Sequence, residues 1–211
     1  MTYMTDLIDG YHRFRHKDWA RERERWSDLA EGQSPKVMIL SCADSRVDPA
    51  QIFDARPGEM FVVRNIAALA PPYETSRGYH GVSAALEFAV TQLKVAEILV
   101  MGHGLCGGCA AGLTGQFQDT DPGEGHFIAD WVSMLDGARA TVTGRHRTLD
   151  RAAYLDMEWE AVKVSLANLR TFPWIAEREA AGDLTLHGAH FSIAEGRLYM
   201  LDEAEGCFRP V

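Results

Sequence analysis

The sequence predicts an α/β fold in which helices flank a mainly parallel central sheet. Runs that are apolar on both faces suit strands covered on both sides, and three short runs of this kind predict the central strands. They are KVMILSC (36–42), EMFVV (59–63) and AEILVM (96–101). Between the second and third runs, residues 81–95 place apolar side chains at helical spacing. Such a helix supplies the crossover that parallel strands require.

An N-terminal helical arm is expected before these strands. Residues 12–31 alternate charges densely, and Trp19 and Trp26 lie seven positions apart, so they share one side of a helix. The arm is either a solvated surface helix or a segment whose tryptophans pack on another subunit.

The C-terminal half predicts further helices and then a β-hairpin. The helices are expected at 126–140, 152–170 and 174–181. Two β-like runs, 184–193 and 196–202, flank the turn residues Glu195 and Gly196. We expect this hairpin to close an edge of the sheet.

Length and composition restrict the organisation and the partners. The chain has 211 residues, of which 46% are hydrophobic, and neither a linker nor a repeat divides it. We expect a single domain over 1–211, with the helical arm at 1–31 and the α/β core at 32–211. The net charge of −9 disfavours nucleic acid and anionic membranes. With neither a secretory signal nor an apolar run long enough for a membrane span, we expect a cytoplasmic protein.

Residues that commonly bind metals follow two of the predicted strands. Cys42 ends the first strand and His103 follows the third, and ligands collect at the carboxyl ends of strands in open α/β sheets. Cys106 lies three residues after His103 in a glycine-rich loop. Two thiolates and one imidazole form the ligand set of a zinc site that leaves its fourth position open. For Cys106 alone, a structural thiol, a nucleophile and a redox dithiol with Cys109 remain alternatives.

A carboxylate and a guanidinium lie beside this ligand set. Asp44 is two residues after Cys42, so in extended backbone it points to the same side and is a conditional fourth metal ligand. Arg46 can hold that carboxylate through two hydrogen bonds. The pair therefore predicts a switch: Arg46 either keeps Asp44 away from the metal or releases it to cap the metal.

SCADSRVDP (41–49) and GHGLCGG (102–108), with PGEMFVVRNIAALAPP (57–72) between them, closely resemble the β-class carbonic anhydrases, in particular their plant-like subgroup. The resemblance implies reversible hydration of carbon dioxide to bicarbonate and a proton, by attack of zinc-bound hydroxide. It implies one Zn²⁺ per chain, and a homodimer or dimer-based oligomer in which N-terminal helices embrace the neighbour. The metal ligands that it implies are Cys42, His103 and Cys106, with Asp44 paired to Arg46 or bound to zinc.

The resemblance also implies a substrate pocket. Gln33 matches a glutamine that hydrogen-bonds bicarbonate, Phe61 and Ile66 match apolar pocket residues, and Gly107 matches a glycine whose backbone approaches the ligand. Phe88 stands where the plant-like pattern commonly has tyrosine, so a polar contact is lost there while the apolar wall remains.

A second, regulatory bicarbonate site is not expected. The subgroup that has one carries a tryptophan and a tyrosine at the positions held here by Ile39 and Phe191, although Arg64 is retained. Arg64 is therefore either an active-site or interface charge or part of a structural ion pair. His80 and His190 are candidates for moving the proton to buffer, and each can equally be a surface or core histidine.

Two thiolates cancel the charge of zinc, so its water should be a weaker acid than at a three-histidine site, and we expect activity to rise toward alkaline pH. Two alternatives to a carbonic anhydrase remain. One is a hydrolase of carbonyl sulfide or carbon disulfide on the same scaffold, which only pocket shape would distinguish. The other is a non-catalytic zinc protein, although such a site would not need Asp44, Arg46 and Gln33.

Overall fold

The computed structural model describes residues 2–118 and 126–211, and it divides into two compact units, Met1–Ser34 and Pro35–Val211. In the N-terminal unit, helix α1 (Tyr3–Phe14) continues into the π-helical turn η1 (Arg15–Trp19), and α2 (Arg23–Glu31) follows. Helix formation thus begins earlier than the predicted residue 12 and is interrupted near residue 22, whose backbone leaves the helical region.

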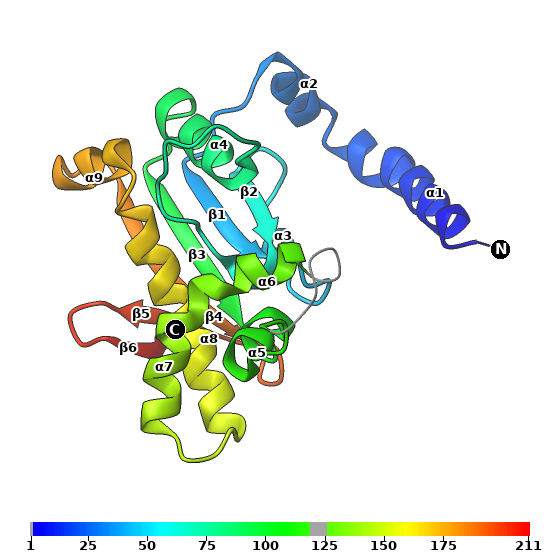
Figure 1. The fold of residues 1–211 in the computed structure, drawn as a ribbon. Coiled ribbons are helices and arrows are strands. Elements are labelled where there is room, and N and C mark those ends of the chain that lie inside the picture. The colour runs from blue at the N-terminus through cyan, green and yellow to red at the C-terminus, as the bar shows by residue number, and fades with distance from the viewer. Residues whose placement is uncertain (1, 119–125) are drawn as a thin grey trace. The chain divides into compact units, whose positions relative to one another are not determined.

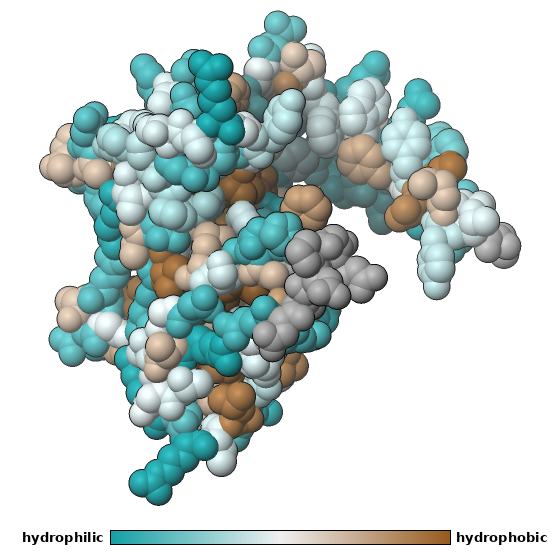
Figure 2. All heavy atoms as spheres, viewed as in Figure 1, coloured by the Kyte–Doolittle hydropathy of each residue, from teal (hydrophilic) through white to brown (hydrophobic). Residues whose placement is uncertain are grey.

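Helix α1 presents an apolar face that its own unit does not bury. Tyr3, Met4, Leu7, Ile8 and Tyr11 recur at helical spacing, and all are exposed. Figure 2 shows hydrophobic residues at the surface of this unit among hydrophilic ones.

The two predicted arm tryptophans make different contacts. The ring of Trp26 meets Phe14 edge-on with centroids 5.7 Å apart, whereas Arg23 lies over the ring of Trp19. The alternative in which a tryptophan seam packs on another subunit stays a prediction.

The core unit is built on one mixed sheet of strand order β2-β1-β3-β4-β5-β6 (Figure 1). Its first four strands in that order run parallel, β5 pairs antiparallel with β4, and β6 pairs antiparallel with β5. The strand bounds are β1 (Val37–Cys42), β2 (Met60–Asn65), β3 (Glu97–His103), β4 (Thr185–Ser192), β5 (Arg197–Asp202) and β6 (Cys207–Pro210). The three predicted central strands and the predicted α/β class are confirmed.

The C-terminal hairpin is present as β4 and β5, and its turn contains Gly196 at φ +60°. Strand β4 also pairs in parallel with β3, so it belongs to the central sheet as well as to the hairpin. The short strand β6, which the sequence pattern does not predict, forms the outer edge. It ends in Pro210, a residue that lacks a ladder N–H and is therefore found on edge strands.

The helices predicted for the core unit are present, with shifted ends. The crossover helix ends at Gln92, shortly before Lys94, which has φ +54°. The predicted helix 126–140 contains a 3₁₀ turn and continues to Arg145. The elements are α3 (Pro49–Ile52), η2 (Ile66–Ala68), α4 (Gly81–Glu87), η3 (Phe88–Gln92), α5 (Gly107–Thr114), α6 (His126–Val132), η4 (Ser133–Leu135), α7 (Asp136–Arg145), α8 (Arg151–Leu169) and α9 (Pro173–Ala180).

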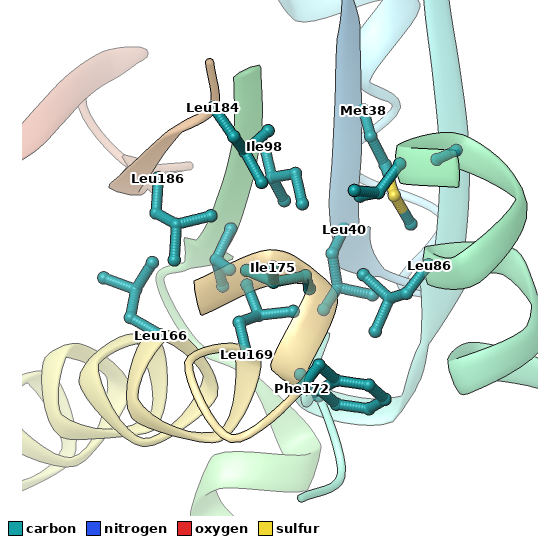
Figure 3. Close-up of a cluster of buried hydrophobic side chains, with 14 of the residues drawn as sticks. Met38, Leu40, Leu86, Ile98, Leu166, Leu169, Phe172, Ile175, Leu184 and Leu186 are labelled. Carbon is teal, nitrogen blue, oxygen red and sulfur yellow. The ribbon is translucent and has the colours of Figure 1, made fainter. Parts of the chain in front are cut away.

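The main core lies between the sheet and helices α4, α8 and α9. Leu40 of β1, Ile98 of β3 and Leu186 of β4 meet Leu86 of α4 and Leu166 of α8 (Figure 3). These side chains are nearly inaccessible to solvent, so the core fixes the positions of the parallel strands whose carboxyl ends carry Cys42 and His103.

Helix α8 lies unusually close to β3 and β4 because both strands place a glycine beneath it. A Cβ on Gly102 would lie 2.8 Å from Val162 Cγ2, and one on Gly188 would lie 2.9 Å from Val162 Cγ1. A side chain at either position would require Val162 or the surrounding backbone to shift. The helix begins at the N-cap Asp150, whose carboxylate accepts from the amides of Ala152 and Ala153.

Candidate metal centre

Three buried side chains meet where β1 and β3 end. Cys42 is the last residue of β1, His103 is the last of β3, and Cys106 is the N-cap of α5. One ligand atom of each lies within 4.8 Å of the others. The two sulfurs are 4.0 Å apart although 64 residues separate them in the sequence. Pairing of β1 with β3 in parallel brings the two strand ends together, as the sequence predicts.

The imidazole of His103 is held with one nitrogen free for a ligand. Its Nδ1 lies 2.9 Å from the carbonyl oxygen of Gly104, so Nδ1–H donates to that carbonyl. Its Nε2 is buried, and among the described residues it has no hydrogen-bond partner. A metal ion beside the two sulfurs would use this lone pair, so the residues present fit a zinc ion with three protein ligands.

Both thiols are held in surroundings that favour their protonated form in the absence of a cation. Hydrogen bonding with Cys106 and burial raise the pKa of Cys42 to about 12. Hydrogen bonding with Cys109, together with burial, raises the pKa of Cys106 to about 12. A divalent cation would reverse this preference, because it binds the thiolate.

Asp44 and Arg46 form a two-pronged ion pair beside the three ligands. Arg46 Nε donates to Asp44 Oδ1 over 2.9 Å, and Arg46 Nη2 donates to Asp44 Oδ2 over 2.6 Å. The hydrogen bonds from Arg46 hold the pKa of the Asp44 carboxyl well below its usual range. Oδ2 lies 3.9 Å from Nε2 of His103, so the carboxylate borders the metal ligands while Arg46 holds it.

Arg46 also fixes the loop that carries Cys106. Its Nη2 donates to the carbonyl oxygen of Leu105 over 3.1 Å. Leu105 has φ +59°, a left-handed conformation that is strained for a branched residue. The ion pair and the metal-binding loop are therefore linked through one side chain.

Arg64, whose role the sequence leaves open, ties together the segment that follows β1. Its guanidinium donates to the carbonyl oxygens of Cys42 and Asp44, and Nη1 contacts Asp48 Oδ2 at 3.1 Å. The structural ion pair is the alternative that these contacts favour. Of the two positions linked to a regulatory site, Ile39 packs with Met101 and Ala189, and Phe191 packs on the core around the metal cluster.

The predicted substrate residues divide into separate groups. Ile66 lies beside the metal-binding loop, since a Cβ on Gly108 would be 2.7 Å from Ile66 Cγ2. At Gly107, the first residue of α5, the space that a Cβ would occupy is open. Ile66 also lines a cavity of about 840 Å³, together with Ala43 and Asn65.

Phe61 and Phe88 lie together, away from this end of the sheet. Their ring centroids are 5.9 Å apart. Phe61 precedes the end of β2 by four residues, which is about 13 Å of extended strand. Gln33 belongs to the N-terminal unit, and its part in the site stays a prediction.

Three further histidines of the core unit have identifiable partners. His80 lies 3.3 Å from the carboxylate of Glu74 at the rim of the large cavity. His187 pairs with Glu97 at 3.2 Å. His190 is buried, and its Nε2 lies 2.9 Å from Glu158 Oε2.

Glu158 is a site residue that sequence reasoning missed. Its Oε1 accepts the backbone N–H of Cys106 over 3.2 Å. The sequence did contain a signal for it: Glu158 lies next to Met157 and before Ala161 and Val162, which puts an acidic residue on the apolar side of a predicted helix. Only the packing of α8 on the sheet shows which group it contacts.

Comparisons with known proteins agree with this geometry. The sequence profile of the carbonic anhydrase family matches residues 37–198. The chain is 36% identical over 191 residues to β-carbonic anhydrase 3 of Arabidopsis thaliana, covering 90% of this chain and 73% of that protein. This plant relative accords with the plant-like subgroup.

Solved structures extend the likeness over the whole fold. The β-carbonic anhydrase CcaA superposes with a TM-score of 0.92 at 31% identity, covering 99% of this chain and 92% of that one. A tetrameric β-carbonic anhydrase of Sordaria macrospora gives 0.82 at 27% identity, with 98% of both chains covered. Together with the Cys42, His103 and Cys106 cluster, these likenesses place the chain in the β-carbonic anhydrase family.

Proposed function

We propose that the protein catalyses the reversible hydration of carbon dioxide at a zinc centre formed by Cys42, His103 and Cys106. The observation that carries the proposal is the convergence of two buried sulfurs and a ring nitrogen of His103 within 4.8 Å, with Nε2 of that ring lacking a hydrogen-bond partner in the described part of the chain. When bound there, zinc would act as a Lewis acid that makes water nucleophilic near physiological pH.

Asp44 has two roles in this proposal. Ionised and held by Arg46, it accepts a hydrogen bond and orients the attacking water, which the low pKa of its carboxyl favours. Released from Arg46, Asp44 would be free to bind the zinc as a further ligand, which would leave no place for water and so stop the reaction. The separation of 3.9 Å between Oδ2 and the His103 Nε2 supports a small movement between these states.

Substrate is held by a mostly apolar surface with few polar groups. Ile66 provides apolar contact next to the metal-binding loop, and Gly107 leaves room for substrate against the backbone. Gln33 hydrogen-bonds the bicarbonate product. Carbon dioxide needs placement rather than tight binding, because uniform binding of substrate and transition state does not raise the rate of the chemical step.

Phe61 and Phe88 support a proposal that the working unit is a dimer. Both are predicted pocket residues, yet Phe61 lies about 13 Å along β2 from the metal end, and Phe88, which packs on Phe61, is 44% exposed. We assign them to the site of a second copy of the chain. The Sordaria macrospora relative is tetrameric, which supports a dimer-based assembly.

The remaining expectations concern partners and location. Within the described residues, no helix combines the length and apolar character that crossing a bilayer requires. A cytoplasmic location, the absence of nucleic-acid binding and the absence of a regulatory bicarbonate site stay predictions.

The proposal is tested by stopped-flow hydration of carbon dioxide with zinc quantified in the same sample. Wild type should hold about one zinc per chain and be more active at alkaline than at neutral pH, because two thiolates offset the charge of the ion. Cys106→Ser should lose zinc and activity together. Cys207→Ser is the matched control, since this thiol is exposed on β6.

The outcomes separate the competing functions. Zinc-loaded wild type that hydrolyses carbonyl sulfide or carbon disulfide but does not hydrate carbon dioxide would replace the proposed substrate. Zinc without any of these activities would indicate a binding or structural centre. Full zinc content and full rate in Cys106→Ser would remove Cys106 from the ligand set.

A further inference from the structure

Glu158 contributes a buried carboxylate that the proposed reaction does not use. The residue is 5% exposed and sits on α8 among apolar neighbours. A buried carboxylate is costly unless its oxygens are hydrogen-bonded, and both oxygens of Glu158 have partners. Oε1 accepts the amide of Cys106 over 3.2 Å, and Oε2 contacts His190 Nε2 at 2.9 Å.

Of the three ligand residues, Cys106 is the one least supported by regular secondary structure, and it is the one that Glu158 contacts. Cys42 and His103 end strands and are held by the sheet ladder, whereas Cys106 follows the strained residue Leu105. As N-cap of α5, Cys106 has an amide outside the hydrogen bonds of that helix. Glu158 supplies the missing acceptor from the far side of the loop.

His190 completes the arrangement. It is 1% exposed and surrounded by the rings of Trp159, Tyr199 and Phe208, with centroids 6.3 to 6.5 Å away. This aromatic surround leaves the imidazole little freedom, and the imidazole in turn fixes Glu158. Gly104, Leu105, Glu158 and His190 also line one cavity of about 260 Å³, so the loop before Cys106 would have room to shift without this restraint.

Glu158 reaches the loop that carries Cys106 because helix α8 packs closely on strands β3 and β4. Val162 is one helical turn further along α8 and lies against Gly102 and Gly188. The side chain of Ser165 donates to the carbonyl oxygen of Ala68, which holds the next turn of the helix in place. The contact from Glu158 to Cys106 therefore rests on a rigid element rather than on a loop.

We infer that Glu158, held by His190, is a positioning residue that fixes the backbone of Cys106 and so places its sulfur for zinc. Partners that orient the ligands of a metal commonly change metal affinity or activity by about 10- to 100-fold when they are removed. The inference rests on the proposed zinc centre, and it is therefore tested on metal affinity and ligand geometry rather than on hydration.

The experiment measures zinc affinity by competition with a chromogenic chelator, on the full chain. Glu158→Leu removes the acceptor and should weaken zinc binding by about 10- to 100-fold. Glu158→Gln keeps a carbonyl oxygen for the Cys106 amide and should stay within about threefold of wild type. Glu160→Gln is the matched control, because Glu160 lies on the same helix and pairs with Lys163 and Arg145.

The absorption spectrum of the cobalt-substituted protein reports the geometry of the metal ligands, which a general loss of protein stability would not change. Co²⁺ spectra of folded Glu158→Leu should show altered cysteine-to-metal charge-transfer bands, while Glu158→Gln and Glu160→Gln should match wild type. If Glu158→Leu does not fold, His190→Phe replaces it, and we expect several-fold weaker zinc binding and the same spectral change.

The outcomes distinguish this inference from the proposed function. A folded Glu158→Leu variant, or its His190→Phe replacement, with wild-type zinc affinity and cobalt spectrum would show a purely structural pair and overturn the inference. Wild type that binds no zinc would instead overturn the proposed centre itself. Loss of affinity in Glu158→Leu with rescue in Glu158→Gln would establish the positioning role.

Discussion

At the scale of single residues, the chemistry of the proposed metal centre depends on the hydrogen bonds that orient His103 and Asp44. His103 Nδ1 is occupied by a backbone carbonyl, so Nε2 remains for the metal. Arg46 occupies both oxygens of Asp44 and also the carbonyl of Leu105. His103 and Asp44 thus each have a second contact that sets their orientation, and removal of such a contact should have measurable effects.

Arg46→Ala tests the pairing at this scale. Without the guanidinium, the pKa of Asp44 should rise toward its ordinary value of about 3.9, so the carboxylate remains ionised at neutral pH but is free to reach the metal. We expect zinc content to be unchanged and the hydration rate at neutral pH to fall by about 10- to 100-fold. Stopped-flow hydration with zinc analysis measures both.

The control for this change is Arg147→Ala, which removes an arginine from the exposed segment between α7 and α8. It should retain both zinc and activity. A full hydration rate in Arg46→Ala at neutral pH would argue against any gating or orienting role for the pair.

At the scale of elements, the close approach of α8 to the sheet determines how the site is supported. Gly102 and Gly188 remove the side chains that would separate helix and strands. The helix can therefore carry Glu158 to the loop after β3. The π-helical end of the crossover segment and the 3₁₀ turn within 126–145 show that sequence periodicity locates helices better than it locates their irregularities.

Gly188→Ala tests this packing. The added Cβ would lie 2.9 Å from Val162 Cγ1, 3.0 Å from Leu166 Cδ1 and 3.1 Å from Leu201 Cβ. Overpacking of this kind should lower the free energy of unfolding by about 1–3 kcal/mol. Denaturant unfolding of the zinc-loaded protein, followed by far-UV circular dichroism, measures the change.

Gly137→Ala is the control within an α-helix. No atom of residues 2–118 or 126–211 lies within 4 Å of the position that its Cβ would take, and helix propensity favours alanine over glycine. We expect stability equal to wild type or up to about 1 kcal/mol greater. Equal stability of Gly188→Ala and wild type would mean that α8 can move outward at little cost.

At the scale of the whole molecule, two sets of apolar residues lack cover within their own units. The face of α1 exposes Leu7 and Ile8, and the core unit exposes Phe88 next to Phe61. Exposed apolar groups of this size commonly mark protein interfaces. Both features favour the proposed dimer-based assembly.

A double substitution on α1, Leu7→Asp with Ile8→Asp, tests the assembly. Placing two charges on the apolar face should weaken association, and light scattering after size-exclusion chromatography should show a smaller species than wild type. Asp6→Asn with Asp9→Asn alters neighbouring positions of the same helix without adding charge to the apolar face, so it should leave the assembly intact. An unchanged mass for the double aspartate variant would exclude α1 from the interface.

The sequence by itself determined strands β1 to β5, the candidate metal donors and the position of the Asp44 and Arg46 pair. Parallel strands end at a common edge, so Cys42 and His103 were expected at the same edge of the sheet, and Cys106 lies only three residues after His103. Asp44 and Arg46 are two residues apart, so their ion pair is a local feature. Each of these features can be recognised in a few consecutive residues or in a single strand.

Only the tertiary structure decided the contacts between segments that are remote in the chain. Glu158 is 52 residues from Cys106, and its hydrogen bond depends on how closely α8 packs on the sheet. The carbonyl groups that Arg64 binds depend on the register of β1 with β2. The separation of Phe61 and Phe88 from the metal end depends on where β2 and the crossover segment lie. Periodicity specifies which side of an element is buried, but the partner it meets is set by side-chain volumes and backbone approach across the whole core.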